Sequence, residues 1–304
     1  MNLRELLRGR DLILLDGAMG TQLAAGGFAP GGAQNLLHPE AVRSIHDAYL
    51  RAGARGIITN TLTDNRIFTE SHGITSDVSR INTAGAALAR AAVEHARAAA
   101  GGTTAGVNAD AFVLGDLSST GQLLEPYGDF TEEQFIAAFK EQALILAGAG
   151  VEGFIVETVM DLREAVCALR GCKGVSALPV LVTLSFQTLA NGGRTAMGNS
   201  AEECARTLTR EGADAIGANC GDLDPFEIAE MLPVFRAASD LPLVVQPNAG
   251  KPRLVDGKAR FDMEPARFAE GLARCIERGA RVVGGCCGTS PAHISAAARL
   301  LFPR

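Results

Sequence analysis

The sequence contains no tryptophan and only two tyrosines, so it has little material for an aromatic cage around a quaternary ammonium ligand. It has no basic excess either, since 28 Lys and Arg stand against 34 Asp and Glu. Nucleic acid is therefore not an expected partner. No apolar run approaches the roughly 18–20 residues of a membrane span, and the first segment is too short for a signal peptide. These absences predict a cytoplasmic protein with no membrane partner.

The chain also lacks a low-complexity linker or a break in composition, so we expect one domain over residues 1–304. What it has instead is an alternation of short β-branched runs with longer stretches of helical period. Eight of the short runs are predicted as strands: 12–17, 56–61, 112–118, 153–158, 179–186, 214–220, 242–248 and 281–287. Eight such units predict an α/β fold, a (β/α)8 TIM barrel. A doubly wound open sheet is the alternative.

Polar and metal-capable residues end most of these predicted strands, and in a TIM barrel the carboxyl ends of the strands form the active-site rim. Of the seven cysteines, four fall in helical segments and are predicted as buried packing residues: Cys167, Cys172, Cys204 and Cys275. The other three differ, because Cys220 ends the sixth predicted strand while Cys286 and Cys287 end the eighth. We expect these three thiols to meet over the barrel mouth.

Three thiols at one rim predict a zinc site with ligands Cys220, Cys286 and Cys287 and a fourth position open to substrate. For both neighbours to reach one ion, the strand must end and turn between them, and the flanking glycines permit this. Three thiolates make zinc a poor Lewis acid for water but hold a substrate thiol deprotonated and nucleophilic. The ligand set therefore predicts alkyl transfer to sulfur, with a zinc hydrolase as a rival.

The cysteine pair has other interpretations. It could be a buried packing pair or a strained vicinal disulfide, and a closed structural zinc site would need a fourth Cys or His at a strand end. The five histidines fall in predicted loops or helices, so no general base beyond the metal is expected.

A thiol substrate must also be held by its other end. The glycine-rich loop 15–23 could direct backbone N–H groups toward a carboxylate. Asp16 and Glu157, at two strand ends of the same rim, could bind an ammonium group. Together these features predict that the substrate is a zwitterionic amino acid that carries a thiol.

Several segments resemble the homocysteine S-methyltransferase family over nearly the whole chain: LLDGAMGTQL, ITNTLTDNR, EPYGDFT with FKEQ, FIVETVMDLREA, GANC, PNAG and GGCCGTSPAHI. The resemblance implies a TIM-barrel enzyme that transfers a methyl group to the thiol of homocysteine and forms methionine. It implies zinc ligands at the three strand-end cysteines. It also implies substrate contacts at Asp16, Gly17, Ala18 and Glu157, with Asn60 and Thr61 nearby.

The segments QPNAG and GGCCGT are most similar to the homocysteine module of cobalamin-dependent methionine synthase. By that likeness Asn248 is a displaceable fourth zinc ligand, and the donor is methylcobalamin carried by a separate corrinoid protein, because no folate or corrinoid module is present in the chain. The scarcity of aromatic residues disfavours betaine. S-methylmethionine and S-adenosylmethionine are alternative donors, and a non-catalytic thiol- or amino-acid-binding barrel is a further alternative.

Overall fold

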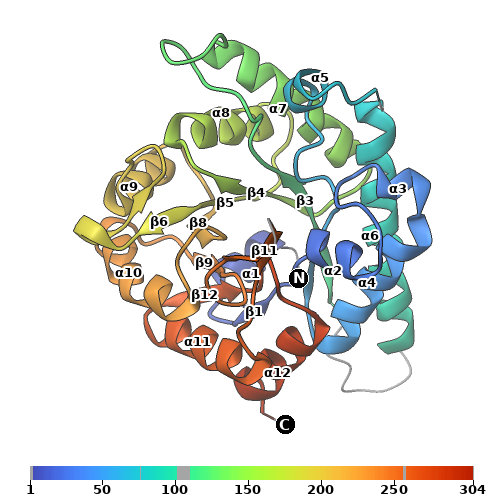
Figure 1. Ribbon diagram of the computed structural model, residues 1–304, viewed down its shortest axis with the longest axis vertical. Coiled ribbons are helices and arrows are strands. Elements are labelled where there is room, and N and C mark those ends of the chain that lie inside the picture. The colour runs from blue at the N-terminus through green and yellow to red at the C-terminus, as the bar shows by residue number, and fades with distance from the viewer. Residues whose placement is uncertain (1–2, 76, 101–109, 256–257, 304) are drawn as a thin grey trace.

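The computed structural model describes residues 3–75, 77–100, 110–255 and 258–303, and its main feature is a sheet of eight parallel strands (Figure 1). The strands follow one another around the sheet in the order β1-β12-β9-β8-β5-β4-β3-β2. Their bounds are β1 (Ile13–Leu14), β2 (Gly56–Ile58), β3 (Phe112–Leu117), β4 (Gly153–Val159), β5 (Val180–Leu184), β8 (Ala215–Asn219), β9 (Leu243–Gln246) and β12 (Ala280–Val283). The sheet closes where Leu15 pairs with Gly56, and the Asp16 N–H donates to the Gly56 carbonyl at 3.0 Å. The predicted TIM barrel is confirmed.

One helix, α1 (Leu3–Arg8), lies at the centre of the ring in Figure 1. The other helices lie outside the strands: α2 (Gly20–Ala25), α3 (Gln34–Leu37), α4 (Pro39–Ala52), α5 (Arg66–Ser71), α6 (Val78–Ala100), α7 (Glu132–Gly148), α8 (Leu162–Lys173), α9 (Ala201–Arg210), α10 (Pro225–Ala238), α11 (Pro265–Glu277) and α12 (Pro291–Leu301). Several begin at a side-chain cap. Thr131 and Gln134 form a capping box at α7, and Asp224 and Glu227 form one at α10. None of the described helices is long and apolar enough to cross a membrane.

Two short hairpins lie at the carboxyl end of the barrel, beyond the strands that precede them. One pairs β6 (Phe186–Thr188) with β7 (Arg194–Thr195) around the 3₁₀ turn η1 (Ala190–Gly192), and the other pairs β10 (Arg253–Val255) with β11 (Lys258–Arg260). In Figure 1 the second hairpin projects onto the centre of the ring.

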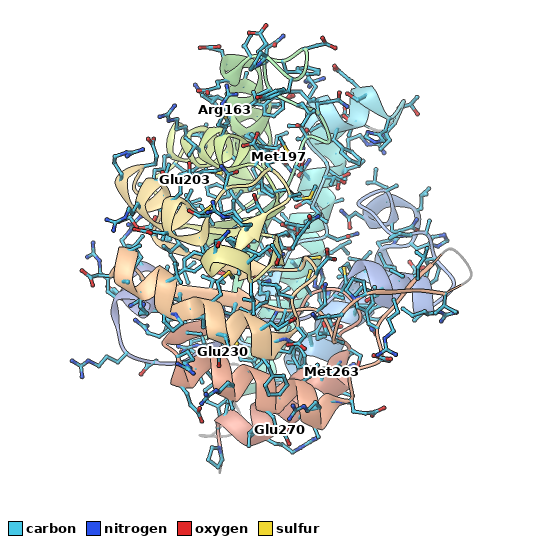
Figure 2. The ribbon with its side chains drawn as sticks, turned by 60° about the vertical axis from the view of Figure 1, so that its left-hand side comes forward. Arg163, Met197, Glu203, Glu230, Met263 and Glu270 are labelled. Atoms are coloured by element: carbon cyan, nitrogen blue, oxygen red, sulfur yellow. The ribbon has the colours of Figure 1, made fainter. Side chains whose placement is uncertain are left out.

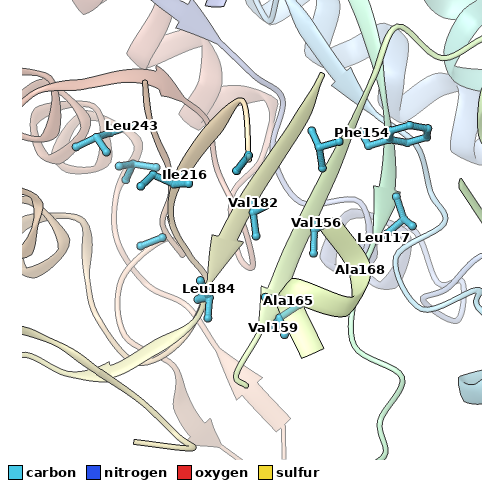
Figure 3. Packing of buried hydrophobic residues seen from close by; sticks show 14 of the residues in the cluster. Leu117, Phe154, Val156, Val159, Ala165, Ala168, Val182, Leu184, Ile216 and Leu243 are labelled. Carbon is cyan, nitrogen blue, oxygen red and sulfur yellow. The ribbon is translucent and has the colours of Figure 1, made fainter. Parts of the chain in front are cut away.

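The hydrophobic core has two parts. The larger part lies between the sheet and the helices, and Figure 3 shows Ala165 and Ala168 of α8 beside Val156 of β4. The smaller part fills the barrel interior with residues from the strands together with Leu3 and Leu6 of α1. Because α1 covers the amino end of the barrel in the described part of the chain, a ligand would reach the interior from the carboxyl end.

The outer helix faces are charged. Figure 2 labels Glu203, Glu230 and Glu270, which are exposed on α9, α10 and α11. Two of them belong to ion pairs, Glu230 with Arg278 at 3.1 Å and Glu270 with Arg267 at 2.8 Å. Such exposed pairs contribute little to stability, about 0–1 kcal/mol each, so they keep the surface polar without determining the fold.

Candidate active site

Three cysteine sulfurs converge at the carboxyl end of the barrel. Cys220 follows β8 directly, while Cys286 and Cys287 follow β12. The three Sγ atoms all lie within 4.8 Å of one another, and Cys220 Sγ is 4.0 Å from Cys287 Sγ. Tetrahedral zinc with bonds of about 2.3 Å would set two sulfurs about 3.8 Å apart. The three predicted ligands are therefore placed to hold one ion, and no other group of three or more metal-binding side chains this close occurs among the described residues.

The two adjacent cysteines share one site because neither belongs to a strand. Strand β12 ends at Val283, earlier than the predicted end at 287, so the alternation of faces along a strand does not apply to them. Cys220 reaches the cluster through a left-handed backbone, with φ of 53°. A non-glycine residue in this region is strained, which is common at functional sites.

The glycines beside the pair serve two different purposes. Only Gly288, with φ of 78°, adopts the left-handed conformation that the sequence predicts for this turn. Gly284 and Gly285 are needed for space. A β carbon at Gly284 would lie 2.8 Å from Leu15 Cβ, and one at Gly285 would lie 2.6 Å from Thr289 Oγ1. Close packing therefore explains two of the three glycines, against Leu15 after β1 for Gly284 and against Thr289 after β12 for Gly285.

The three thiols share their protons unequally. Cys286 and Cys287 stabilise the Cys220 thiolate by hydrogen bonds, which lowers the pKa of Cys220 to about 3. The same bonds to Cys220 raise the pKa of Cys287 to about 12 and the pKa of Cys286 well above its usual value. Cysteines bind a metal ion in their deprotonated form, so a metal ion bound here would replace the protons of Cys286 and Cys287. The cluster therefore fits a metal ion. By contrast, burial raises the pKa of Cys275 to about 12, as expected of a packing residue.

Beside the sulfurs lies a cavity of about 450 Å³, lined by the three cysteines and by four carboxylates: Asp16, Asp64, Asp116 and Glu157. The Oδ2 atom of Asp16 accepts the Ile58 N–H at 2.9 Å, while its Oδ1 is buried without a protein donor. Glu157 Oε2 accepts hydrogen bonds from Asn219 Nδ2 at 3.1 Å and from Gln246 Nε2 at 3.3 Å.

The cavity is acidic and lacks a countercharge. Burial raises the pKa of Asp64 to about 7, and burial together with the nearby Cys220 charge raises the pKa of Glu157 to about 8. Burial and neighbouring carboxylates also raise the pKa of Asp16 and Asp116. None of the described residues that line the cavity is a lysine, arginine or histidine. A cationic ligand would therefore favour the ionised carboxylates.

The predicted substrate contacts lie in different settings. Asp16, Gly17, Ala18, Asn60 and Glu157 line the cavity. The Ala18 N–H already donates to Thr289 Oγ1 at 3.0 Å, and Asn60 Nδ2 donates to Asn35 Oδ1 at 2.9 Å. Thr61 is buried behind the wall, where its hydroxyl donates to the Asp116 carbonyl at 2.9 Å.

Asn248 is buried beside the cysteine cluster. Its Nδ2 donates to the Gly221 carbonyl at 2.9 Å, and its side chain also hydrogen-bonds the Cys220 thiolate, which helps to lower the pKa of Cys220. Its Oδ1 has no partner in the protein. The amide is therefore near the cluster, and its free oxygen is a further donor atom for a cation.

Asn219 organises the site, although the sequence analysis did not select it. Its Oδ1 accepts the Thr158 N–H and the Thr183 hydroxyl, both at 2.8 Å, and its Nδ2 donates to Glu157. The same Nδ2 lies 3.9 Å from Cys286 Sγ. Its position beside Cys220 in the segment GANC indicated that it lies near the site. The sequence does not show which groups an amide at a strand end contacts.

Two further residues of the site were missed. Thr289 links the loop after β1 to the cysteine turn, because its hydroxyl accepts from the Ala18 N–H and donates to the Cys286 carbonyl at 2.7 Å. Asp64 lies in the loop after β2, beyond any strand end, so strand position gave no reason to choose it.

The buried Asp64 carboxyl predicts a pH-dependent cost to folding. Its pKa is 3.8 when unperturbed and about 7 in the fold, so the folded state binds its proton more tightly than the unfolded state. Stability from this group is present below its unfolded pKa and is lost as pH rises through its folded pKa. Asp64→Asn should therefore gain stability relative to the unaltered protein between about pH 4 and about pH 8, as urea unfolding would measure. A difference that does not change with pH would contradict this assignment.

Comparison with known proteins agrees with this geometry. A family model described as homocysteine S-methyltransferase matches residues 13–301. Methionine synthase of Mycobacterium tuberculosis (strain ATCC 25618 / H37Rv) is 30% identical over 295 residues, which cover 92% of this chain and 24% of that protein. Methionine synthase of Mycobacterium leprae (strain TN) is 31% identical over 92% of this chain and 23% of its own length. The chain spans about a quarter of the length of these curated relatives.

Solved structures give a match along the whole barrel. The homocysteine methyltransferase MmuM from Escherichia coli, in its metallated form, superposes with a TM-score of 0.78 at 26% identity, covering 97% of this chain and 98% of that chain. Its oxidized form superposes with a TM-score of 0.77 at 27% identity, covering 97% of each chain.

Proposed function

The chain belongs to the homocysteine S-methyltransferase family, and from that premise we propose that it is a zinc-dependent enzyme that transfers a methyl group to the thiol of homocysteine and forms methionine. The observation that carries this proposal is the convergence of three cysteine sulfurs, within 4.8 Å of one another, on a cavity lined by buried carboxylates. The three sulfurs suit the thiol end of homocysteine, and the carboxylates suit the ammonium group at its other end.

Cys220, Cys286 and Cys287 would hold the zinc ion. When bound, zinc supplies a positive centre that deprotonates the homocysteine thiol at neutral pH and keeps its sulfur nucleophilic. Asn248 is proposed as the displaceable fourth ligand, a role supported by its partnerless Oδ1 beside the cluster. No general base is needed from the chain in this proposal, because bound zinc would itself lower the pKa of the homocysteine thiol.

Asp16 and Glu157 are proposed to bind the ammonium group of homocysteine. Asp16 Oδ1 is buried with no donor, and Glu157 is held in place by Asn219 and Gln246. An ammonium group between them would reverse the rise in their pKa values by favouring the charged carboxylates. These contacts would orient the substrate so that its sulfur lies at the cysteine cluster.

The loop after β1 and the end of β2 are proposed to complete the substrate pocket. Gly17 must lack a side chain, because a β carbon there would lie 2.6 Å from Thr289 Oγ1, and it leaves the loop backbone facing the cavity. Ala18 follows it, and Asn60 forms part of the opposite wall. Thr61 would act indirectly, through its bond to the Asp116 backbone.

The donor proposal has two forms. Likeness to the methionine synthases supports methylcobalamin carried by a separate corrinoid protein. S-methylmethionine or S-adenosylmethionine is the second candidate, and one observation favours it: the cavity has four carboxylates, of which the ammonium of homocysteine needs only two. A barrel that binds a thiol amino acid without turnover is the non-catalytic alternative.

One assay tests the function and separates the donors. Purified, reduced protein is analysed for zinc and then incubated with homocysteine and each of the three donors in turn, with methionine as the measured product. We expect zinc in the protein and methionine from at least one donor. Bound homocysteine with no turnover on any donor would support the non-catalytic barrel, and protein that binds no zinc would contradict the proposed mechanism.

A further inference from the structure

One short segment at the end of β9 is hydrogen-bonded to the backbone of every cysteine in the cluster. This β9 segment consists of Gln246, Pro247, Asn248 and Ala249. The Cys220 N–H donates to the carbonyl of its first residue at 3.0 Å, and the Cys286 N–H donates to the carbonyl of its second at 2.8 Å. The N–H of its fourth residue donates to the Cys287 carbonyl at 2.9 Å. The β9 segment is therefore a common backbone support for the three sulfurs.

The same segment carries the amide beside the cluster. Asn248 Nδ2 donates to the Gly221 carbonyl at 2.9 Å, and the Gly250 N–H donates to the Asn248 carbonyl at 2.8 Å. The Asn248 Oδ1 is buried without a protein donor. Because one segment holds three cysteine backbones and this free oxygen, any shift of the segment would change the whole donor set at once.

The β9 segment is held from outside the cavity by Met263. The β10–β11 hairpin leaves the chain after the segment and returns to it here, where the Met263 N–H donates to the Ala249 carbonyl at 3.0 Å. Phe261, at the same base of the hairpin, packs against the cysteine turn, because a β carbon at Gly288 would overlap Phe261 Cβ. The base of the hairpin is therefore fitted between the β9 segment and the turn that follows Cys287.

A buried histidine fixes Met263 in turn. His293 lies in the first turn of α12 and is 8% exposed, and its ring packs edge-on against Phe268 with centroids 5.5 Å apart. Its Nδ1 accepts the Ser290 N–H at 3.2 Å, so the ring proton is placed on Nε2. The Nε2–H then donates to the Met263 carbonyl at 2.9 Å.

These contacts form a closed path around the cysteine turn. The path runs from Cys287 to Ala249, Met263 and His293, and it returns through Ser290, which follows Cys287 by three residues. Its other hydrogen-bonding groups belong to the backbone, whereas His293 contributes a side chain. A substitution at His293 can therefore open the path without altering a cysteine or the β9 segment.

We propose that His293 is a positioning residue of the metal centre, which holds the β9 segment against the cysteine cluster and so slows the loss of bound zinc. It is not among the described residues that line the cavity, so it acts through Met263 and Ala249. The proposal rests on the proposed function in one respect, that the three cysteines hold zinc. Side chains that orient metal ligands commonly change metal affinity by about 10–100-fold.

Two substitutions separate the bond to Met263 from the bond to Ser290. A glutamine at this position can accept the Ser290 N–H with its Oε1 and donate to the Met263 carbonyl with its Nε2. A glutamate can accept the Ser290 N–H in the same way, as in a capping box, but its ionised carboxylate has no hydrogen to donate. His293→Gln should therefore keep the path closed, and His293→Glu should open it.

Transfer of zinc from the loaded, reduced protein to an excess of a chromogenic chelator measures the effect. We expect His293→Glu to release zinc about tenfold or more faster than the unaltered protein, and His293→Gln to stay within about threefold of it. Urea unfolding of the metal-free proteins measures the stability of each variant separately.

Thr131→Ala is the control for stability alone. It removes the capping hydroxyl of α7 and so should lower the midpoint of unfolding, but Thr131 bonds only to Gln134 of its own helix among the printed contacts of its hydroxyl. This variant should release zinc at the rate of the unaltered protein. A lower stability would then be separated from a faster loss of metal.

Zinc release at one rate from both histidine variants, whether slow or fast, would overturn the proposal, because the bond to Met263 would not control it. Faster release from Thr131→Ala would also overturn it, since lower stability would then explain the effect. Failure of the proposed function would appear separately, as an unaltered protein that holds zinc but forms no methionine, and the comparison of release rates would still decide the role of His293. An unaltered protein that holds no zinc would overturn both.

Discussion

Replacing Cys286 with serine is expected to lower the rate of methionine formation by about a thousandfold or more, because the metal centre loses one of its three thiolates. A serine hydroxyl stays protonated at neutral pH and is a poor zinc ligand. Cys286 Sγ also lies 3.9 Å from Asn219 Nδ2, so its loss removes a contact between the cluster and the residue that holds Glu157. Metal content by mass spectrometry and the initial rate of methionine formation measure the two effects.

Cys275→Ser is the matched control for this experiment. Cys275 is fully buried in α11, and its Sγ donates to the Pro225 carbonyl at 3.2 Å. A serine hydroxyl can make the same bond, so this variant should keep zinc and nearly the full rate. If Cys286→Ser instead retained zinc and turnover, the three strand-end cysteines would not be the metal site. Loss of zinc from both variants would indicate a general loss of structure.

The fold was predictable because the hydrophobic periodicity and the residue types along the chain indicate the same strands and helices. All eight predicted strands are present, yet most end earlier than predicted, as β12 does at Val283 instead of residue 287. The reason is physical. Near the barrel mouth, glycines and polar residues leave the hydrogen-bonded ladder and turn toward the cavity, while the sequence still reads as part of the strand. The boundary error therefore falls at the residues that build the site.

The cysteine site was predictable for a different reason. Thiols are rare, and only three of the seven fell outside helical segments, so position and chemistry selected the same residues. Asparagine and aspartate carry no such distinction. Asn219, Asp64 and Gln246 function through contacts between segments far apart in the chain, such as the bond from Gln246 to Glu157. Sequence spacing does not specify those contacts, and a tertiary structure is needed to find them.

Replacing Gly217 with alanine is expected to destabilise the protein by about 3 kcal/mol or more, the upper part of the range for overpacked sites. Gly217 is in the middle of β8 and pairs with Val244 of β9. A β carbon at Gly217 would overlap the Val244 carbonyl and also lie 2.8 Å from its carbonyl carbon. Because these are backbone atoms of the barrel, no side-chain rotation can relieve the overlap, and the two strands must separate.

The consequence extends to the site, since Asn219 and Cys220 follow Gly217 along β8 and would move with it. Gly148→Ala is the control: a β carbon there meets nothing within 4 Å, and alanine at the end of α7 should be neutral or stabilising by up to about 1 kcal/mol.

Urea unfolding of the metal-free proteins measures both changes. Gly217→Ala should lose stability even without metal, whereas Cys286→Ser should lose zinc with little change in metal-free stability. An unchanged unfolding midpoint for Gly217→Ala would mean that β8 and β9 can separate at this point without cost, and that the register of β8 does not position the cysteine cluster.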